Sequence, residues 1–133
     1  PGTFDLYQQT IQWSRRFIGL KIFLTLAELG DAGIAALVDH QAEMGAYLCE
    51  HLRANGFRVV NDSPLPIACF TRDAPPILPA EIARRVAAEG KAWLSEVRTH
   101  GPYALHALRA CITHHDTQRG DVEALVSAVQ RVA

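Results

Sequence analysis

Two pairs of short segments, each pair joined by a turn, restrict the folds open to this 133-residue chain. Segments 57–60 and 66–72 have the composition of strands and flank the turn-rich stretch NDSPL. Segments 92–99 and 104–113 are of the same kind and flank the turn HGPY. Strands joined by turns this short pair in antiparallel fashion. The four segments therefore predict an antiparallel four-stranded sheet.

Helical patterns precede, separate and follow the two strand pairs. Residues 15–29 are almost uniformly apolar after two arginines, which predicts a helix buried on most of its surface and ended by Gly30. A second helix is expected from Ile34 to the Asn55-Gly56 stop. Further helices are expected over 80–89 and 118–132. The order predicts an α+β domain with its helices packed on one face of the sheet.

Composition excludes several function classes. Thirteen basic residues against fourteen acidic ones leave a net charge of -1, which gives no reason to expect nucleic acid or an anionic membrane as partner. The three cysteines stand far apart without a CxxC motif, and this usage is typical of reduced thiols in a cytoplasmic protein. No apolar run reaches the roughly 18 residues of a membrane span. The opening PGTFDLYQQ lacks the features of a signal peptide.

The stretch ALRACITHHDT, residues 107–117, concentrates chemically versatile side chains. On a strand, Leu108, Ala110 and Ile112 point to one face and Arg109, Cys111 and Thr113 to the other. His114 and His115 would also diverge if the strand continued, and adjacent histidines without HxH or HxxxH spacing form a poor metal chelate. Asp116 or Thr117 is available to cap the last helix. We therefore expect no metal site in this chain.

Arg109 is the residue of this stretch that is hardest to explain by structure alone. An arginine among apolar strand residues is rarely buried unless it is paired. Two structural interpretations are open: Arg109 forms an ion pair, or it lies on the open face of the sheet. The functional interpretation is that its guanidinium binds a carboxylate or phosphate through bidentate hydrogen bonds. The local pattern favours the two structural interpretations.

Lys21, Arg15 and Arg16 are the other charged residues near the N-terminus that stand out in the sequence. Lys21 stands alone between Arg16 and Glu28, where a buried amine could become a nucleophile, although such lysines more often reach the surface or pair with a carboxylate. Arg15 and Arg16 begin a helix, where the macrodipole disfavours cations, so we expect an acidic partner nearby.

The segment WSRRFIGLKIFLTLAELGDAGIAALVDHQAEMGAYLCEHL contains an Arg-Arg-Phe, a Leu-Lys and a long apolar helix ended by glycine. It resembles the start of the C-terminal domain of the group II pyridoxal-phosphate-dependent amino-acid decarboxylases, a family that includes the aromatic amino-acid, tyrosine, glutamate and diaminobutyrate decarboxylases. FRVVNDSPLPIACFTR resembles the family's hairpin, and ALRACITHHDTQRGDVEALVSAVQRV its closing strand and helix. The resemblance extends over nearly the whole chain from about Ile11.

The resemblance implies that residues 15–133 are the C-terminal small domain of a fold-type-I enzyme and that residues 1–14 end the large-domain linker. The family's Schiff-base lysine follows a histidine in the large domain, and neither Lys21 nor Lys91 lies in such a motif. The resemblance therefore places the pyridoxal 5'-phosphate site and the catalytic groups in the large domain, outside this sequence. It also aligns Arg109 with a strand arginine near the substrate α-carboxylate.

The sequence thus predicts part of a cytoplasmic lyase that decarboxylates a small amino acid, with its own large domain and a second subunit of a homodimer as partners. Taken alone, the chain is expected to be inactive and to bind itself through Phe4–Trp13 and its first helix. The alternative is a stand-alone α+β module that binds a small carboxylate or a protein without catalysis.

Overall fold

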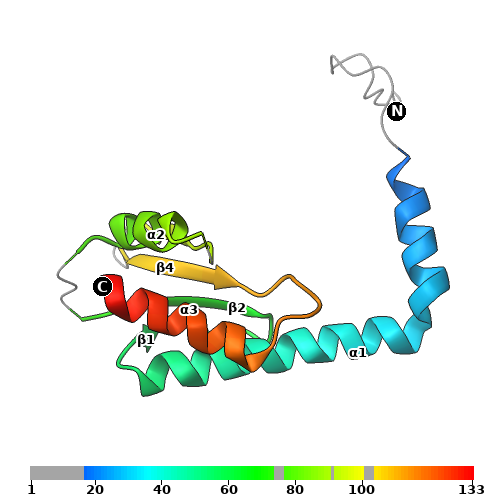
Figure 1. The fold of residues 1–133 in the computed structure, drawn as a ribbon, viewed down its shortest axis with the longest axis horizontal. Coiled ribbons are helices and arrows are strands. Elements are labelled where there is room, and N and C mark those ends of the chain that lie inside the picture. The colour runs from blue at the N-terminus through cyan, green and yellow to red at the C-terminus, as the bar shows by residue number, and fades with distance from the viewer. Residues whose placement is uncertain (1–16, 74–76, 91, 101–103) are drawn as a thin grey trace, which may run out of the picture. The chain divides into compact units, whose positions relative to one another are not determined.

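The computed structural model describes residues 17–73, 77–90, 92–100 and 104–133 (Figure 1). Three helices and four strands follow one another in the predicted order, except that the first two predicted helices are joined. The elements are α1 (Ile18–Ala54), β1 (Arg58–Val59), β2 (Ile67–Thr71), α2 (Pro79–Ala88), β3 (Ser95–Arg98), β4 (His106–Cys111) and α3 (Arg119–Val132).

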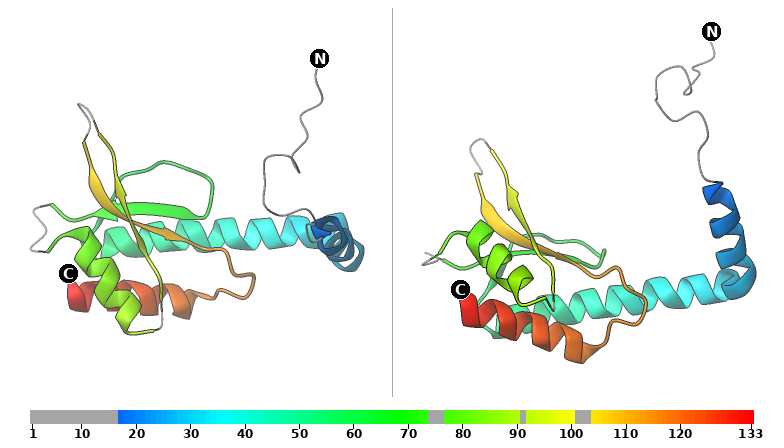
Figure 2. Two further views of the ribbon diagram at one scale, coloured as in Figure 1. Left: turned by 90° about the horizontal axis from the view of Figure 1, so that it is seen from above. Right: turned by 45° about the horizontal axis from the view of Figure 1, so that its top comes forward.

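The four strands form one antiparallel sheet in the order β1-β2-β4-β3, which confirms the predicted architecture. Each of the predicted pairs is a ladder, and the central ladder between β2 and β4 joins the two pairs into one sheet. Figure 2 shows β3 and β4 running side by side. In this register Arg109 lies opposite Cys69 on β2 and opposite Ser95 on β3.

The core lies between one face of the sheet and the helices. Phe70 and Ala68 of β2 and Leu108 and Ala110 of β4 are at most 3% exposed, because their side chains alternate toward the helices. The helices supply the apolar side chains that cover them, namely Leu48 and Leu52 from α1, Ile82 and Val86 from α2, and Val122, Val126 and Val129 from α3. The prediction of helices on one face of the sheet is therefore confirmed.

Polar contacts fasten α3 along the C-terminal part of α1. Arg119 pairs with Glu43 at 3.0 Å, and Tyr47 donates to the Glu123 carboxylate at 2.7 Å. At the far end of α3, Gln130 donates to the Asn55 side chain at 3.0 Å. These contacts hold both ends of α3 against the C-terminal part of α1 and the turn that follows it.

Gly30 interrupts α1, as the sequence predicted. Its φ of 61° and ψ of -179° are not helical, and an L side chain rarely adopts such a φ. Contacts divide the chain into two compact units, Pro1–Ala35 and Ala36–Ala133. The break at Gly30 thus lies within the first unit. The predicted boundary between residues 14 and 15 lies outside the described residues.

The helix before Gly30 corrects one expectation. We expected it to be buried on most of its surface, yet its large apolar side chains are 42% to 66% exposed in this chain, and Phe17 just before it is 77% exposed. A helix hydrophobic on all sides needs covering from several directions, which the described residues do not supply. We call this part of the chain the apolar segment, defined by Phe17, Ile18, Leu20, Ile22, Phe23, Leu24, Leu26 and Leu29. No helix of the described residues is long and apolar enough to cross a membrane.

Candidate functional site

The outer face of the sheet, opposite the helices, displays the residue that sequence analysis selected. Leu108, Ala110 and Ile112 are buried, whereas Arg109, Cys111 and Thr113 are exposed. This alternation is the one that the strand pattern predicts. Arg109 therefore stands on the open face of the central strand β4, with the core directly behind it.

Arg109 is oriented by Ser95 rather than by a carboxylate. Its Nε atom donates a hydrogen bond to the Ser95 hydroxyl oxygen at 3.1 Å across the β3–β4 ladder. In the part of the chain that the structure describes, Arg109 forms no ion pair. Of the two structural interpretations, the open sheet face is the observed one and the structural ion pair is not.

The hydrogen bond to Ser95 leaves most of the guanidinium available to a ligand. A guanidinium carries five N–H donors in a rigid fork, and the Ser95 bond uses only the Nε donor. The terminal nitrogens retain the geometry that binds a carboxylate or phosphate through two parallel hydrogen bonds. The chemistry that this face offers is anion binding.

Two thiols share the outer face with Arg109. Cys69 lies opposite Arg109 on β2, and Cys111 lies two residues after it on β4. Burial raises the pKa of the Cys69 thiol, and nearby Cys111 raises that pKa further, while the positive charge of Arg109 lowers it. The sequence pattern already placed Cys111 on the same face as Arg109, but it did not associate Ser95 or Cys69 with Arg109, because only the strand register brings those residues together.

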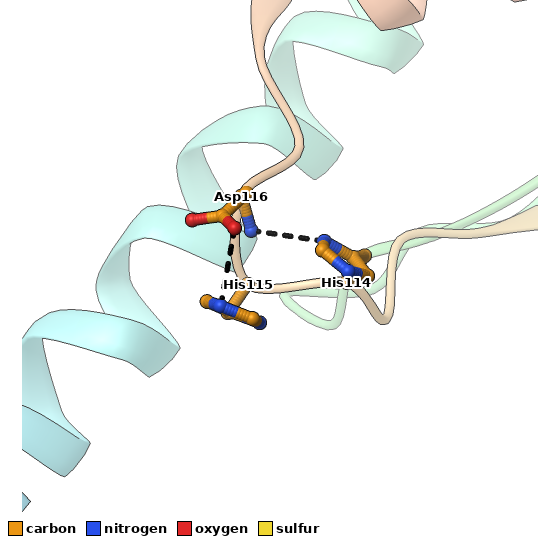
Figure 3. Close-up of side chains that lie close together, drawn as sticks. All are labelled: His114, His115 and Asp116. Atoms are coloured by element: carbon orange, nitrogen blue, oxygen red, sulfur yellow. Dashed lines mark hydrogen bonds and ion pairs between the residues drawn. The ribbon is translucent and has the colours of Figure 1, made fainter.

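His114 and His115 lie beyond the end of β4 and do not diverge as they would on a strand. Their rings stack with centroids 4.7 Å apart, and His115 Nε2 lies 3.2 Å from Asp116 Oδ2 (Figure 3). The expected cap of α3 by Asp116 or Thr117 is wrong. Gln118 is the N-cap and forms a capping box with Asp121, because α3 begins only at Arg119.

The described lysine does not form a cofactor site. Lys21 is exposed on the helix before Gly30, and the hydrogen bond found at this residue joins its carbonyl oxygen to Thr25 Oγ1. It is therefore not the buried amine that would become a nucleophile. Lys91, Arg15 and Arg16 lie outside the described residues.

The pockets lie away from Arg109. A groove of about 320 Å³ lies between α2 and α3 and is lined by residues such as Glu89, Asp121 and Arg131. A second hollow, of about 220 Å³, lies between α1 and the loop before β2 and is lined by residues such as Cys49, Arg53 and Asp62. Arg109 lines neither of these two pockets.

Comparison with solved structures identifies the same fold in several decarboxylases. Tryptophan decarboxylase of Catharanthus roseus matches 96% of this chain with a TM-score of 0.75 at 18% identity, and mouse CSAD matches 96% with a TM-score of 0.76 at 20% identity. The glutamate decarboxylase domain of a diaminobutyrate-pyruvate transaminase and L-2,4-diaminobutyrate decarboxylase from Vibrio parahaemolyticus matches 95% with a TM-score of 0.70 at 20% identity.

This chain spans only 28% to 30% of the length of those three proteins. No protein-family model matches the chain, and no curated protein matches it. At these identities the likeness establishes the fold. The chain therefore has the α+β fold of a small domain of these decarboxylases, as the sequence resemblance predicted.

Proposed function

We propose that this chain is the C-terminal small domain of a pyridoxal-phosphate-dependent amino-acid decarboxylase, and that Arg109 binds the substrate α-carboxylate. The observation that carries the proposal is the fold likeness, which includes almost the whole of this chain and less than a third of each decarboxylase. A domain with that coverage is one part of a larger enzyme. The activity belongs to the assembled protein.

The position of Arg109 supports a role in substrate binding. The side chain stands exposed on an open sheet face, is oriented by Ser95 and has no carboxylate partner among the described residues. A guanidinium that holds a carboxylate by two hydrogen bonds fixes the orientation of the bond next to it. In a decarboxylase, that orientation positions the scissile bond, which is catalysis by positioning.

The cofactor fits a neighbouring large domain better than this chain. Pyridoxal phosphate, when bound, supplies the electron sink for decarboxylation. The described residues offer no buried lysine for it, since Lys21 is exposed. We infer that the large domain holds the cofactor and its lysine, and that this chain by itself is inactive.

The apolar segment supports the inference of further partners. Eight large apolar side chains, each at least 42% exposed, form a surface that water disfavours. We infer that the large domain and the second subunit of a cytoplasmic homodimer cover it in the assembled enzyme.

The direct test is to express the longest reading frame that contains this chain and to assay it beside the chain alone. We expect the longer protein to copurify with pyridoxal phosphate and to release carbon dioxide from one of a panel of amino acids, while the chain alone does neither. A longer protein that binds the cofactor but releases no carbon dioxide would contradict decarboxylation. Stoichiometric cofactor binding by the chain alone would contradict its dependence on the large domain.

The second candidate is a stand-alone module that binds a small carboxylate without catalysis. Its supporting observation is the same exposed Arg109, which offers an anion site whether or not chemistry follows. Saturable binding of acetate or a simple amino acid to the chain alone, lost in Arg109→Lys, would favour this module. The decarboxylase proposal expects no such binding, because a single exposed guanidinium binds carboxylates weakly in water.

A further inference from the structure

Three potential metal ligands gather in the loop between β4 and α3. One ligand atom from each of His114, His115 and Asp116 lies within 4.8 Å of the others. Figure 3 shows the two imidazoles and the carboxylate drawn together around the turn. His115 Nε2 and Asp116 Oδ2 are 3.2 Å apart. Two ligands of a tetrahedral zinc ion lie roughly 3.4 Å apart, given Zn–N and Zn–O bonds of about 2.0–2.2 Å.

The loop is anchored on both sides of the cluster. Before it, Gln41 Nε2 donates to the Thr113 carbonyl oxygen at 3.0 Å. After it, His40 Nε2 lies 2.8 Å from the Thr117 carbonyl oxygen, in a partly buried hydrogen bond. Thr117 Oγ1 also donates to the carbonyl oxygen of His114 at 3.0 Å, which closes the turn. Anchoring reduces the conformational entropy that the loop would lose when it orders around an ion.

The hydrogen bonds identify the electron pairs that an ion would use. The backbone N–H of Asp116 donates to His114 Nδ1 at 3.2 Å, so Nδ1 carries the lone pair and Nε2 the proton. His115 Nε2 faces Asp116 Oδ2, where only a shared proton would stabilise the contact. A cation can replace that proton between His115 Nε2 and Asp116 Oδ2. It can also bind the lone pair of His114 Nδ1, which then gives up its long hydrogen bond from the Asp116 N–H. The two imidazole rings are stacked at an interplanar angle of 21°, so at least one of them must turn for both lone pairs to reach one ion, and all three side chains are exposed and free of packing that would prevent it.

The expectation of no metal site assumed that the two histidines continue a strand and diverge, whereas the loop keeps their ligand atoms and that of Asp116 within 4.8 Å of one another. We propose that His114, His115 and Asp116 form a surface site for a divalent transition-metal ion of the zinc class. Two imidazole nitrogens and one carboxylate oxygen suit Zn²⁺ and its neighbours, whereas Mg²⁺ and Ca²⁺ require mostly oxygen ligands. Water completes the coordination, because the exposed loop leaves one side of the ion open. The site is independent of Arg109 and of any decarboxylase activity.

Titration of the whole chain with Zn²⁺ tests the site. We expect one ion per chain by calorimetry, perturbed ring-nitrogen NMR signals of His114 and His115, and no saturable binding of Mg²⁺. His114→Ala, His115→Ala and Asp116→Asn should each weaken Zn²⁺ binding by about tenfold or more, since even outer partners of metal ligands contribute roughly 10–100-fold.

His51→Ala is the matched control, because His51 stacks on Tyr47 of α1 and takes no part in the cluster. This variant should bind Zn²⁺ as the parent chain does. Amide NMR spectra of each variant establish that the fold is retained, and Asp116→Asn preserves the shape of the loop if an alanine variant does not fold. The proposal is overturned by non-saturable Zn²⁺ binding, by equal affinity in folded variants, or by perturbation of other histidine rings instead.

Discussion

The Nε atom of Arg109 donates a hydrogen bond to the hydroxyl oxygen of Ser95, 3.1 Å away on the neighbouring strand. The bond spans two residues that are 14 positions apart in the sequence and face each other only because of the β3–β4 register. It fixes the plane of a guanidinium that has no carboxylate partner among the described residues. The role of Arg109 in binding and the role of Ser95 in orienting it can therefore be tested by separate substitutions in the proposed decarboxylase.

Arg109→Lys should impair turnover in the proposed decarboxylase, in which this chain is joined to its large domain. Lysine keeps the charge but loses the two-pronged geometry, and a lost charge-assisted hydrogen bond costs roughly 1.5–3 kcal/mol. The corresponding loss of kcat/KM is on the order of ten- to a hundredfold. Because Arg109 is exposed, the melting temperature should barely change.

Arg58→Lys is the control for this substitution. Arg58 is an exposed arginine on the edge strand β1, two strands away from β4, and its guanidinium already pairs with Asp73. Its kinetics should equal those of the parent enzyme. If Arg109→Lys loses thermal stability while kcat/KM per folded molecule is unchanged, Arg109 has no place in substrate binding.

Ser95→Ala should have a smaller effect that depends on Arg109. The bond has a charged donor, but Ser95 acts only through the orientation of Arg109. We therefore expect a loss equivalent to about 0.5–1.5 kcal/mol, or about two- to tenfold in kcat/KM. The measurement is a double-mutant cycle in kcat/KM. Ser95→Ala should have no further effect in the Arg109→Lys background, and an equal effect in both backgrounds would show that Ser95 acts by another route.

The chain alone should self-associate through the apolar segment. Ile22 and Phe23 are 59% and 66% exposed, and burying such side chains between copies removes them from water. Sedimentation velocity should show a mass that rises with concentration, and Ile22→Glu with Phe23→Glu should lower it toward the monomer. Trp93→Glu is the control, since Trp93 is 72% exposed but lies in the other unit. A monomer of the unaltered chain at high concentration would refute the prediction.

Gly45→Ala should destabilise the fold. A Cβ at Gly45 would lie 2.6 Å from the backbone Cα of Pro66, so α1 and the segment before β2 would have to separate. Overpacking of this kind costs about 1–3 kcal/mol in the free energy of unfolding, measurable by denaturant titration. Gly120→Ala is the matched control, because a Cβ in α3 at that position meets nothing within 4 Å. It should be neutral or slightly stabilising, and equal effects at both glycines would exclude the close approach as the cause.

Glu81 should contribute a pH-dependent part of the stability of α2. Hydrogen bonds from Arg84 and then Arg85 lower the pKa of Glu81 from 4.5 to about 2. Because the pKa is lower in the folded state, this stabilisation is complete above about pH 4.5 and is lost as pH falls toward 2. The difference in melting temperature between the parent chain and Glu81→Gln should therefore shrink over that interval. A difference that stays constant from pH 6 to pH 2.5 would contradict the shift.

Much of the fold could be predicted from local patterns. Alternation along residues 108–112 identified the buried and exposed faces of β4 correctly, because a strand side chain has only two directions available. Gly30 and the Asn55-Gly56 stop were also identified, since the conformations at Gly30 and Gly56 have positive φ, which glycine adopts without strain. Local chemistry decides such features, and a sequence displays local chemistry directly.

The features that the sequence predicted wrongly depend on tertiary contacts. The apolar segment reads as a buried helix because hydrophobicity indicates a need for cover, whereas the cover itself comes from elsewhere. The sequence offered Asp116 and Thr117 as caps of α3, but Gln118 is the N-cap in the structure. Its capping box with Asp121 fixes the start of the helix at Arg119.

Sequence alone determined the antiparallel sheet, the helices on one of its faces and the separation of Arg109 from the face of Leu108 and Ala110, since all three follow from periodicity and turn chemistry. Only the tertiary structure decided that Ser95 orients Arg109, that Cys69 lies opposite it, and that His114, His115 and Asp116 converge. Register and loop conformation set those contacts. Both are determined by the packing of residues far apart in the chain, which no local pattern records.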